Sequence, residues 1–250
     1  MRYFIELSYK GTFFHGWQIQ PNAVSVQETL EKGLSVILRD IISVVGAGRT
    51  DTGVHAKYIV AHFETEAVFD PEKLVFKLNS FLPESIAIKQ VFEVNPEAHA
   101  RFHALTRAYE YHIVREKNPF KTEGAYFLKG NLDVEAMNRA AALLLNYTNF
   151  KCFSKSKTDV KTYNCTMFYA YWEEKENLLI FHVSANRFLR NMVRAIVGTL
   201  IDIGKGKLAV DDIHKILASE NRGEAGYSVP AKGLYLTEVT YPKTIHLINE

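Results

Sequence analysis

Residues 46–56, GAGRTDTGVHA, place an arginine, Arg49, and an aspartate, Asp51, two positions apart among three glycines. An aspartate in a glycine-rich turn is most often a turn residue or a helix cap. The alternative is a carboxylate nucleophile that a rigid turn holds after a strand and that a nearby arginine keeps ionised. The residues of this segment alone leave both interpretations open.

The glycines of this segment do not form a phosphate-binding loop. Gly48 and Gly53 have the spacing of the nucleotide-binding loop, but Val54 and His55 follow them where that loop needs lysine and serine or threonine. The dinucleotide fingerprint also fails, because Asp51 stands where it requires glycine. A carboxylate there would repel a phosphate, so we expect no nucleotide cofactor at this turn.

Three arginines form a second candidate group. Arg187, Arg190 and Arg194 have the spacing i, i+3 and i+7, and the sequence predicts a helix over residues 187–203. A basic stripe on a helix is usually a solvated face, but this one lacks the interleaved glutamates of an ion-paired surface. Unpaired arginines suit phosphates or a buried carboxylate, and both interpretations stay open.

The distribution of charge makes a nucleic-acid partner credible. The net charge of +2 is too small to indicate one. However, residues 101–121 hold five basic side chains against two acidic ones, and residues 151–161 hold four against one. These lysines could also be ordinary surface residues.

Other chemistry has little support in the sequence. His99 and His103 are four apart where the sequence favours a strand over a helix, and no third ligand is nearby, so we predict no metal site. Cys152 and Cys165 lack CxxC spacing, which fits a reducing compartment. The N-terminal residues contain no apolar leader and no apolar run could span a membrane, so we expect a cytoplasmic protein.

Two stretches of the chain repeat one order of elements: strand, helix, strand, strand, helix, strand. In residues 1–100, strands are predicted at 3–9, 43–47, 58–63 and 86–94, with helices that begin after Ser25 and Asp70. In residues 101–250, strands are predicted at 107–113, 165–172, 178–185 and 234–241, with helices from Asp133, at 187–203 and at 211–218. This is the split βαβ, ferredoxin-like order. We expect an α/β (α+β) fold of two ferredoxin-like halves with mainly antiparallel sheet, residues 1–100 and 101–250, and an active-site cleft between them.

Several segments together carry a family resemblance. GRTDTGVHA, YKGTFFHGWQIQP with SVQETLE, FHALTRAYEYHI, NRFLRNMVRAIVGTLIDIG and VPAKGLYLTEVTYP resemble segments of the tRNA pseudouridine synthase A family, in the same order. The resemblance covers nearly the whole chain.

The resemblance implies a role for five residues. The family's catalytic aspartate falls on Asp51, and the arginine that replaces the flipped-out target base in the stem falls on Arg49. The active-site tyrosine falls on Tyr109, and the arginine that pairs with the catalytic carboxylate falls on Arg194. The apolar residue that lines the uracil pocket falls on Leu234.

The resemblance also implies an activity: isomerisation of uridine to pseudouridine at positions 38, 39 and 40 in the anticodon stem-loop of tRNA. This reaction needs neither a metal nor a cofactor, and the family acts as a homodimer on tRNA. Three alternatives stay open: an RNA-binding protein without catalysis, a related synthase with a shifted target, and an α/β enzyme acting on a small molecule. The residues Asp51, Tyr109 and Arg194 together argue against the first.

Overall fold

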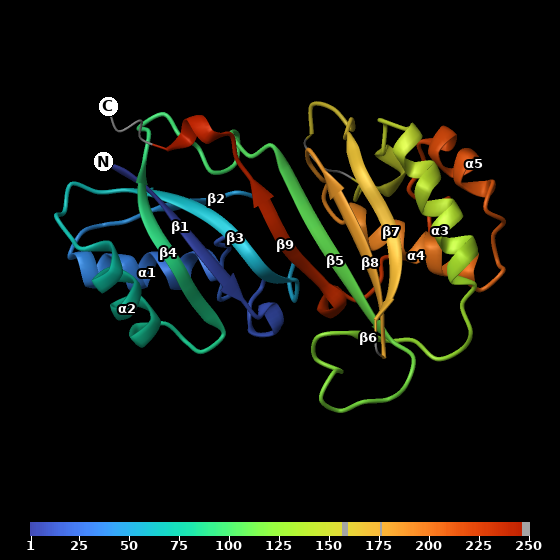
Figure 1. The fold of residues 1–250 in the computed structure, drawn as a ribbon, viewed down its shortest axis with the longest axis horizontal. Helices are drawn as coiled ribbons and strands as arrows, with labels where there is room; N and C mark the ends of the chain where they lie inside the picture. The colour runs from blue at the N-terminus through green and yellow to red at the C-terminus, as the bar shows by residue number, and fades with distance from the viewer. Residues whose placement is uncertain (157–159, 176, 247–250) are drawn as a thin grey trace. The chain divides into compact units, whose positions relative to one another are not determined.

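The computed structural model describes residues 1–156, 160–175 and 177–246, and it divides into two compact units. The first unit consists of Met1–Thr106 and Leu236–Glu250, and the second consists of Arg107–Tyr235. Figure 1 shows the elements of both units. The C-terminal segment from Leu236 thus groups with the first unit, whereas the sequence analysis expects it in the second half.

The first unit has the predicted order strand, helix, strand, strand, helix, strand. Its elements are β1 (Arg2–Tyr9), α1 (Val26–Leu38), β2 (Val44–Gly46), β3 (His55–Glu64), α2 (Pro71–Phe81) and β4 (Ile86–Val94). β1 lies between β3 and β4 and pairs antiparallel with both, and β2 pairs antiparallel with β3.

Local sequence signals set both helix starts of this unit. The Ser25 hydroxyl accepts a hydrogen bond from the backbone N–H of Glu28, and the Asp70 carboxylate accepts from those of Glu72 and Lys73. Pro71 occupies the first turn of α2, where its missing N–H has no cost. The predicted caps are confirmed.

The C-terminal segment completes an apolar cluster in the first unit. Its buried members are Phe4, Val60, Val94, Ala98, Ala100 and Ile245. The Tyr241 hydroxyl donates to the Ala100 carbonyl at 2.6 Å, and the backbone N–H of Asn95 donates to the Ile245 carbonyl at 2.9 Å. These long-range contacts explain why the last residues join the first unit.

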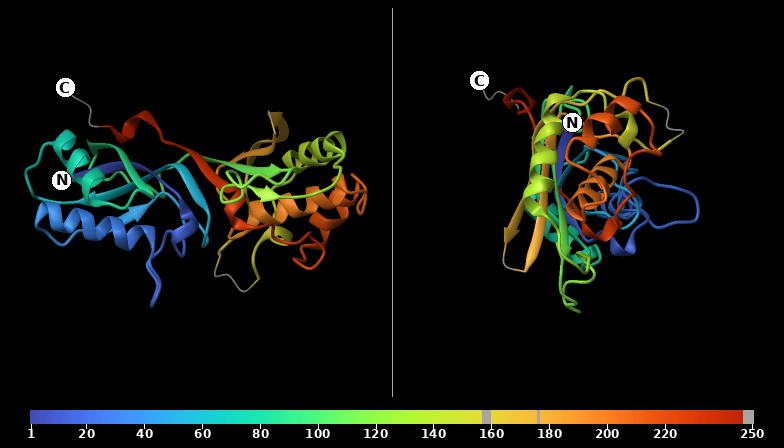
Figure 2. Two further views of the ribbon diagram at one scale, coloured as in Figure 1. Left: turned by 90° about the horizontal axis from the view of Figure 1, so that it is seen from below. Right: turned by 90° about the vertical axis from the view of Figure 1, so that its right-hand side faces the viewer.

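The second unit repeats the order with two additions. Its elements are β5 (Thr106–Val114), β6 (Tyr126–Phe127), α3 (Val134–Leu143), β7 (Met167–Lys175), β8 (Leu178–Ala185), α4 (Met192–Gly204), α5 (Asp212–Ser219) and the start of β9 (Leu234–Thr240). β8 lies between β5 and β7 and is antiparallel to both, whereas β6 is parallel to β5. Figures 1 and 2 show α3, α4 and α5 on one face of this sheet. The predicted mixed α/β fold with mainly antiparallel sheet is confirmed.

The predicted start of the arginine-bearing helix is wrong. α4 begins at Met192, five residues after the predicted Arg187, because Asn191 has φ +67° and the Met192 N–H closes a turn onto the Leu189 carbonyl. Arg187 and Arg190 therefore precede the helix, and only Arg194 lies on it. The three arginines do not form a helical stripe.

Three further observations concern the sequence predictions. β7 begins at Met167 and ends at Lys175, later than the predicted 165–172. Lys157 and Asp159, which belong to the second predicted basic segment, lie outside the described residues. Within the described part of the chain, no helix is long and apolar enough to cross a lipid bilayer.

Candidate active site

The turn that carries Asp51 lies between β2 and β3. The Val54 N–H donates to the Asp51 carbonyl at 3.1 Å, and Gly53 has φ +79°, a turn conformation that favours glycine. Arg49 is exposed, Thr50 is buried and Asp51 is half-buried. The turn thus buries Thr50 and leaves Asp51 partly accessible.

The loop that follows β1 holds this turn on both sides of Asp51. The Thr50 carbonyl accepts from the Trp17 N–H at 3.2 Å, and the Gly53 N–H donates to the Phe14 carbonyl at 3.3 Å. The Thr50 hydroxyl also lies 2.8 Å from the buried hydroxyl of Tyr9. Hydrogen bonds therefore fix the backbone immediately before Asp51 and two residues after it.

Glycines make this close packing possible. A Cβ on Gly11 would lie 1.9 Å from the Val54 carbonyl oxygen, and one on Gly16 would lie 2.4 Å from that of Thr50. Gly16 also has φ +89°. Residues 11–16 were not among the predicted site residues, although two glycines among aromatic residues indicate a close backbone approach.

His55 is a buried support of the turn. Its ring is 2% exposed, and its Nδ1 accepts from the Gly11 N–H at 3.1 Å. The histidine thus joins the first residue of β3 to the loop after β1. It belongs to the scaffold that positions Asp51.

In the second unit, Tyr109 lies on β5 opposite Val183 of β8. Its ring meets Phe188 edge-on, with 5.1 Å between the centroids and an interplanar angle of 88°. Tyr109 is half-buried, whereas Tyr111, two residues along the same strand, is fully buried. The core tyrosine of this strand is therefore Tyr111, and part of Tyr109 is accessible.

Arg194 lies in the first turn of α4 and is hydrogen-bonded to Val229. Its Nε donates to the Val229 carbonyl at 2.7 Å, and the Val229 N–H donates to the Arg194 carbonyl at 3.2 Å. The Tyr111 hydroxyl donates to the adjacent Pro230 carbonyl at 2.8 Å. Burial raises the pKa of Tyr111, and the positive charge of Arg194 opposes this rise. Tyr111 and Arg194 thus both donate hydrogen bonds to the segment 229–230.

Leu234 begins β9 just after that segment. It is 6% exposed, and a Cβ on the preceding Gly233 would lie 2.8 Å from the Tyr111 ring. The second unit thus gathers Tyr111, Arg194 and residues 229–234, and it carries Tyr109 on the same strand as Tyr111. Asp51 and Arg49 belong to the first unit.

The two histidines that are four apart, His99 and His103, accept hydrogen bonds from backbone N–H groups. His103 Nδ1 accepts from the His99 N–H, and His99 Nδ1 accepts from the N–H groups of Arg101 and Phe102. Among the described residues, no three histidine, cysteine, aspartate or glutamate side chains are grouped to hold a metal ion. Burial raises the pKa of Cys152 to about 12 and that of Cys165 to about 11, so both stay protonated and unreactive at neutral pH.

Comparison with known proteins identifies the family. The family model described as tRNA pseudouridine synthase matches residues 7–103 and 140–242. A Bacteroides fragilis protein named tRNA pseudouridine synthase A is 50% identical over 246 residues, 98% of each chain. Proteins of the same name from Parabacteroides distasonis and Bacillus subtilis are 47% and 40% identical, covering 100% and 96% of this chain and 99% of their own lengths. This chain therefore belongs to the tRNA pseudouridine synthase family, a family of isomerases.

Proposed function

We propose that this protein converts uridine to pseudouridine at positions 38, 39 and 40 of the anticodon stem-loop of tRNA, with Asp51 as nucleophile. Family membership and the printed name of its full-length relatives support tRNA as the substrate. The choice of positions rests on the resemblance of the signature segments.

The assignment of Asp51 as nucleophile is supported by one observation, the hydrogen-bonded turn on which it lies. Backbone hydrogen bonds at Thr50 and Gly53 hold the turn, and the carboxylate-bearing residue between them is half-buried rather than enclosed. A nucleophile works best when its position is fixed before the substrate arrives, because reacting atoms must be correctly oriented. A rigid turn with an accessible carboxylate fits that requirement.

The proposed reaction is an isomerisation that conserves all atoms. The Asp51 carboxylate forms a covalent bond to the target nucleotide, and the bond between C1′ and N1 of uracil breaks. The base rotates and C5 bonds to C1′, after which C5 loses a proton, N1 gains one and the carboxylate is released. Since no electron or water is transferred overall, the residues need no redox partner.

We assign the proton transfer to Tyr109 and the pairing with the Asp51 carboxylate to Arg194. The half-buried Tyr109 ring, held edge-on by Phe188, could stack on a flipped uracil while its hydroxyl handles the C5 proton. A tyrosine of ordinary pKa near 10 is a weak base at neutral pH, so a nearby cation is needed to lower it. Arg194 is the proposed cation, and it also pairs with Asp51 in this scheme.

Arg49 and Leu234 are assigned to substrate binding. An enzyme that acts on a stacked base must first extract it, at a cost of roughly a few kcal/mol. The exposed guanidinium of Arg49 is planar and could fill the place of the extracted base. Leu234 offers an apolar wall for uracil.

The proposed assembly follows from the same resemblance, and the proposed location follows from the action on tRNA. We propose a homodimer in the cytoplasm, because the basic segments of one chain are few for a whole tRNA. Light scattering tests this: an active monomer would contradict the dimer.

Mapping pseudouridine in tRNA from cells with and without this protein tests the function. The proposal predicts loss of pseudouridine at positions 38–40 when the gene is deleted and its return with the wild-type gene. Unchanged modification would favour an RNA-binding protein without catalysis, and loss at other positions would favour a shifted target.

A further inference from the structure

A pocket in the second unit lies outside all the residues assigned above. It has a volume of about 260 Å³ and lies where β5 ends and β8 begins. Its lining residues are Val114, Arg115, Glu116, Lys117, Asn118, Lys121, Glu174, Asn177, Leu178 and Leu179. Pockets that enclose whole small molecules measure roughly 300–1,000 Å³, so this one suits a part of a longer chain.

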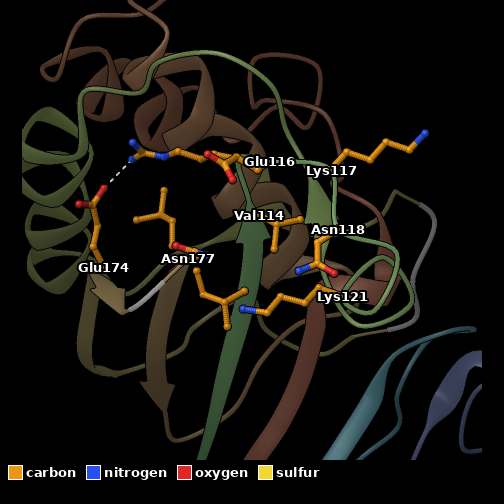
Figure 3. Close-up of a pocket in the computed structure, with 10 residues that line it drawn as sticks. Val114, Glu116, Lys117, Asn118, Lys121, Glu174 and Asn177 are labelled. Carbon is orange, nitrogen blue, oxygen red and sulfur yellow. Dashed lines mark hydrogen bonds and ion pairs between the residues drawn. The ribbon is translucent and has the colours of Figure 1, made fainter.

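The pocket has one end rich in hydrogen-bond donors. Lys121 is half-buried, and among the residues that the structure describes it has no ion-pair partner. The Asn118 side-chain oxygen accepts from the Phe120 N–H at 2.9 Å, which leaves the amide nitrogen to donate elsewhere. Figure 3 shows the Lys121 ammonium and the Asn118 amide at this end of the pocket. A half-buried ammonium without a carboxylate is suited to an anion.

The carboxylates lie at the opposite end. Glu174 pairs with Arg115 at 2.6 Å, the dashed line in Figure 3, and Glu116 lies at the same end. Arg115 thus neutralises one of the two carboxylates. Glu116 would repel a phosphate but could accept a hydrogen bond from a hydroxyl group, such as the 2′-OH that distinguishes RNA.

An exposed aromatic residue is the chain neighbour of Lys121. Phe120 is 96% exposed, directly precedes Lys121 and belongs to the loop that extends beyond the end of β5 in Figure 1. Lys117 is also exposed on this loop. Basic residues interleaved with an exposed aromatic are typical of surfaces that bind single-stranded or looped RNA.

We propose that this pocket binds one ribose-phosphate unit of the RNA substrate. Lys121 and Asn118 donate to the phosphate, and Glu116 accepts from the ribose hydroxyl. The exposed Lys117 contacts the adjoining phosphate, and Phe120 stacks on the neighbouring base. The inference rests on the proposed function, because it takes RNA to be the substrate, but it concerns a second contact with that RNA.

The test compares tRNA affinity over a range of salt concentrations for the wild type and for Lys117→Ala/Lys121→Ala. The slope of log K against log salt is negative, and each lost phosphate contact makes it less steep by about 0.9. We expect the double variant to lose one to two such contacts and roughly five- to tenfold or more in affinity near physiological salt. Lys215→Ala is the control, because it removes one charge from an 80% exposed side chain on α5 and should leave the slope unchanged.

A second variant separates stacking from charge. Phe120→Ala should weaken tRNA binding roughly fivefold or more while the salt slope stays at the wild-type value. Single-turnover rates at saturating tRNA should match the wild type in all these variants. Wild-type affinity and slope in the double lysine variant would overturn the phosphate site, and wild-type affinity in Phe120→Ala would overturn the stacking.

Two further measurements separate the possible sources of failure. Displacement of tRNA by micromolar inorganic phosphate would assign the pocket to a free anion and overturn the RNA contact. A wild-type enzyme that forms no pseudouridine would refute the proposed function alone, because loss of affinity and slope in the lysine variant would still support the RNA site.

Discussion

Replacing Gly11 with alanine should displace the turn that carries Asp51. The new Cβ would lie 1.9 Å from the Val54 carbonyl oxygen and 2.6 Å from its carbon. Both are backbone atoms, so no side-chain rotation relieves the contact, and a separation of even 3.0 Å requires about 1.1 Å of movement. Because the Val54 N–H bonds to the Asp51 carbonyl, that movement reaches the nucleophile.

The expected magnitudes follow from this displacement. Overpacking a well-packed site typically costs about 1–3 kcal/mol, which exceeds the roughly 0.4–1 kcal/mol that alanine gains over glycine in the unfolded chain. A misplacement of about 1 Å at an active site can cost about 10²-fold in rate. Gly11→Ala should therefore lower the free energy of unfolding by about 1–2 kcal/mol and the rate by about a hundredfold.

The assay is single-turnover pseudouridine formation at saturating tRNA, with denaturant unfolding on the same sample. Gly48→Ala is the stability control, since a Cβ there meets no atom within 4 Å and Gly48 does not have positive φ. Gly48→Ala should be as stable as the wild type. A folded Gly11→Ala enzyme that reacts within about threefold of the wild-type rate would refute the reasoning.

Three further predictions use other parts of the molecule. Tyr109→Phe should fold and bind tRNA but lose at least about a hundredfold in single-turnover rate; a wild-type rate would reduce Tyr109 to a packing or stacking residue. Arg49→Ala should slow modification of paired stem uridines more than that of loop uridines, as measured by position-specific mapping, and equal losses would contradict the role of filling the vacated place. Burial lowers the pKa of His62 to about 4, so the unfolded chain, with its ordinary histidine pKa near 6.5, binds more protons between these values. The free energy of unfolding should therefore fall as the pH drops from about 6.5 to about 4, and His62→Asn should flatten this dependence in denaturant titrations.

The parts of the fold that local sequence signals determine, such as the helix starts, could be predicted. Ser25 and Asp70 cap their helices as expected, because a cap needs only a side chain and the N–H groups two or three residues later. The start of α4 could not be predicted, since helical spacing continues through residues 187–194 while Asn191 adopts a left-handed conformation. Such a break is set by packing rather than by propensity.

The hydrogen bonds that hold the Asp51 turn could not be predicted from the sequence either. Asp51 and Arg194 were candidates from their local sequence, whereas their roles and the choice of Tyr109 came from the resemblance. No local pattern shows that Trp17, Phe14 and Gly11 hold the turn. Those contacts join residues more than 30 positions apart, two of them between backbone groups and one to the His55 ring, and the glycines at 11 and 16 indicate a close approach without identifying its partner. The return of Tyr241 and Ile245 to the first unit was missed for the same reason.

The direct test of the central claim is the rate of pseudouridine formation by Asp51→Asn on saturating tRNA in a single turnover. Asparagine is nearly isosteric but cannot act as a carboxylate nucleophile. We expect the variant to fold, to bind tRNA with nearly wild-type affinity and to form no detectable pseudouridine at positions 38–40. Turnover within about tenfold of the wild type in a carefully purified sample would contradict it.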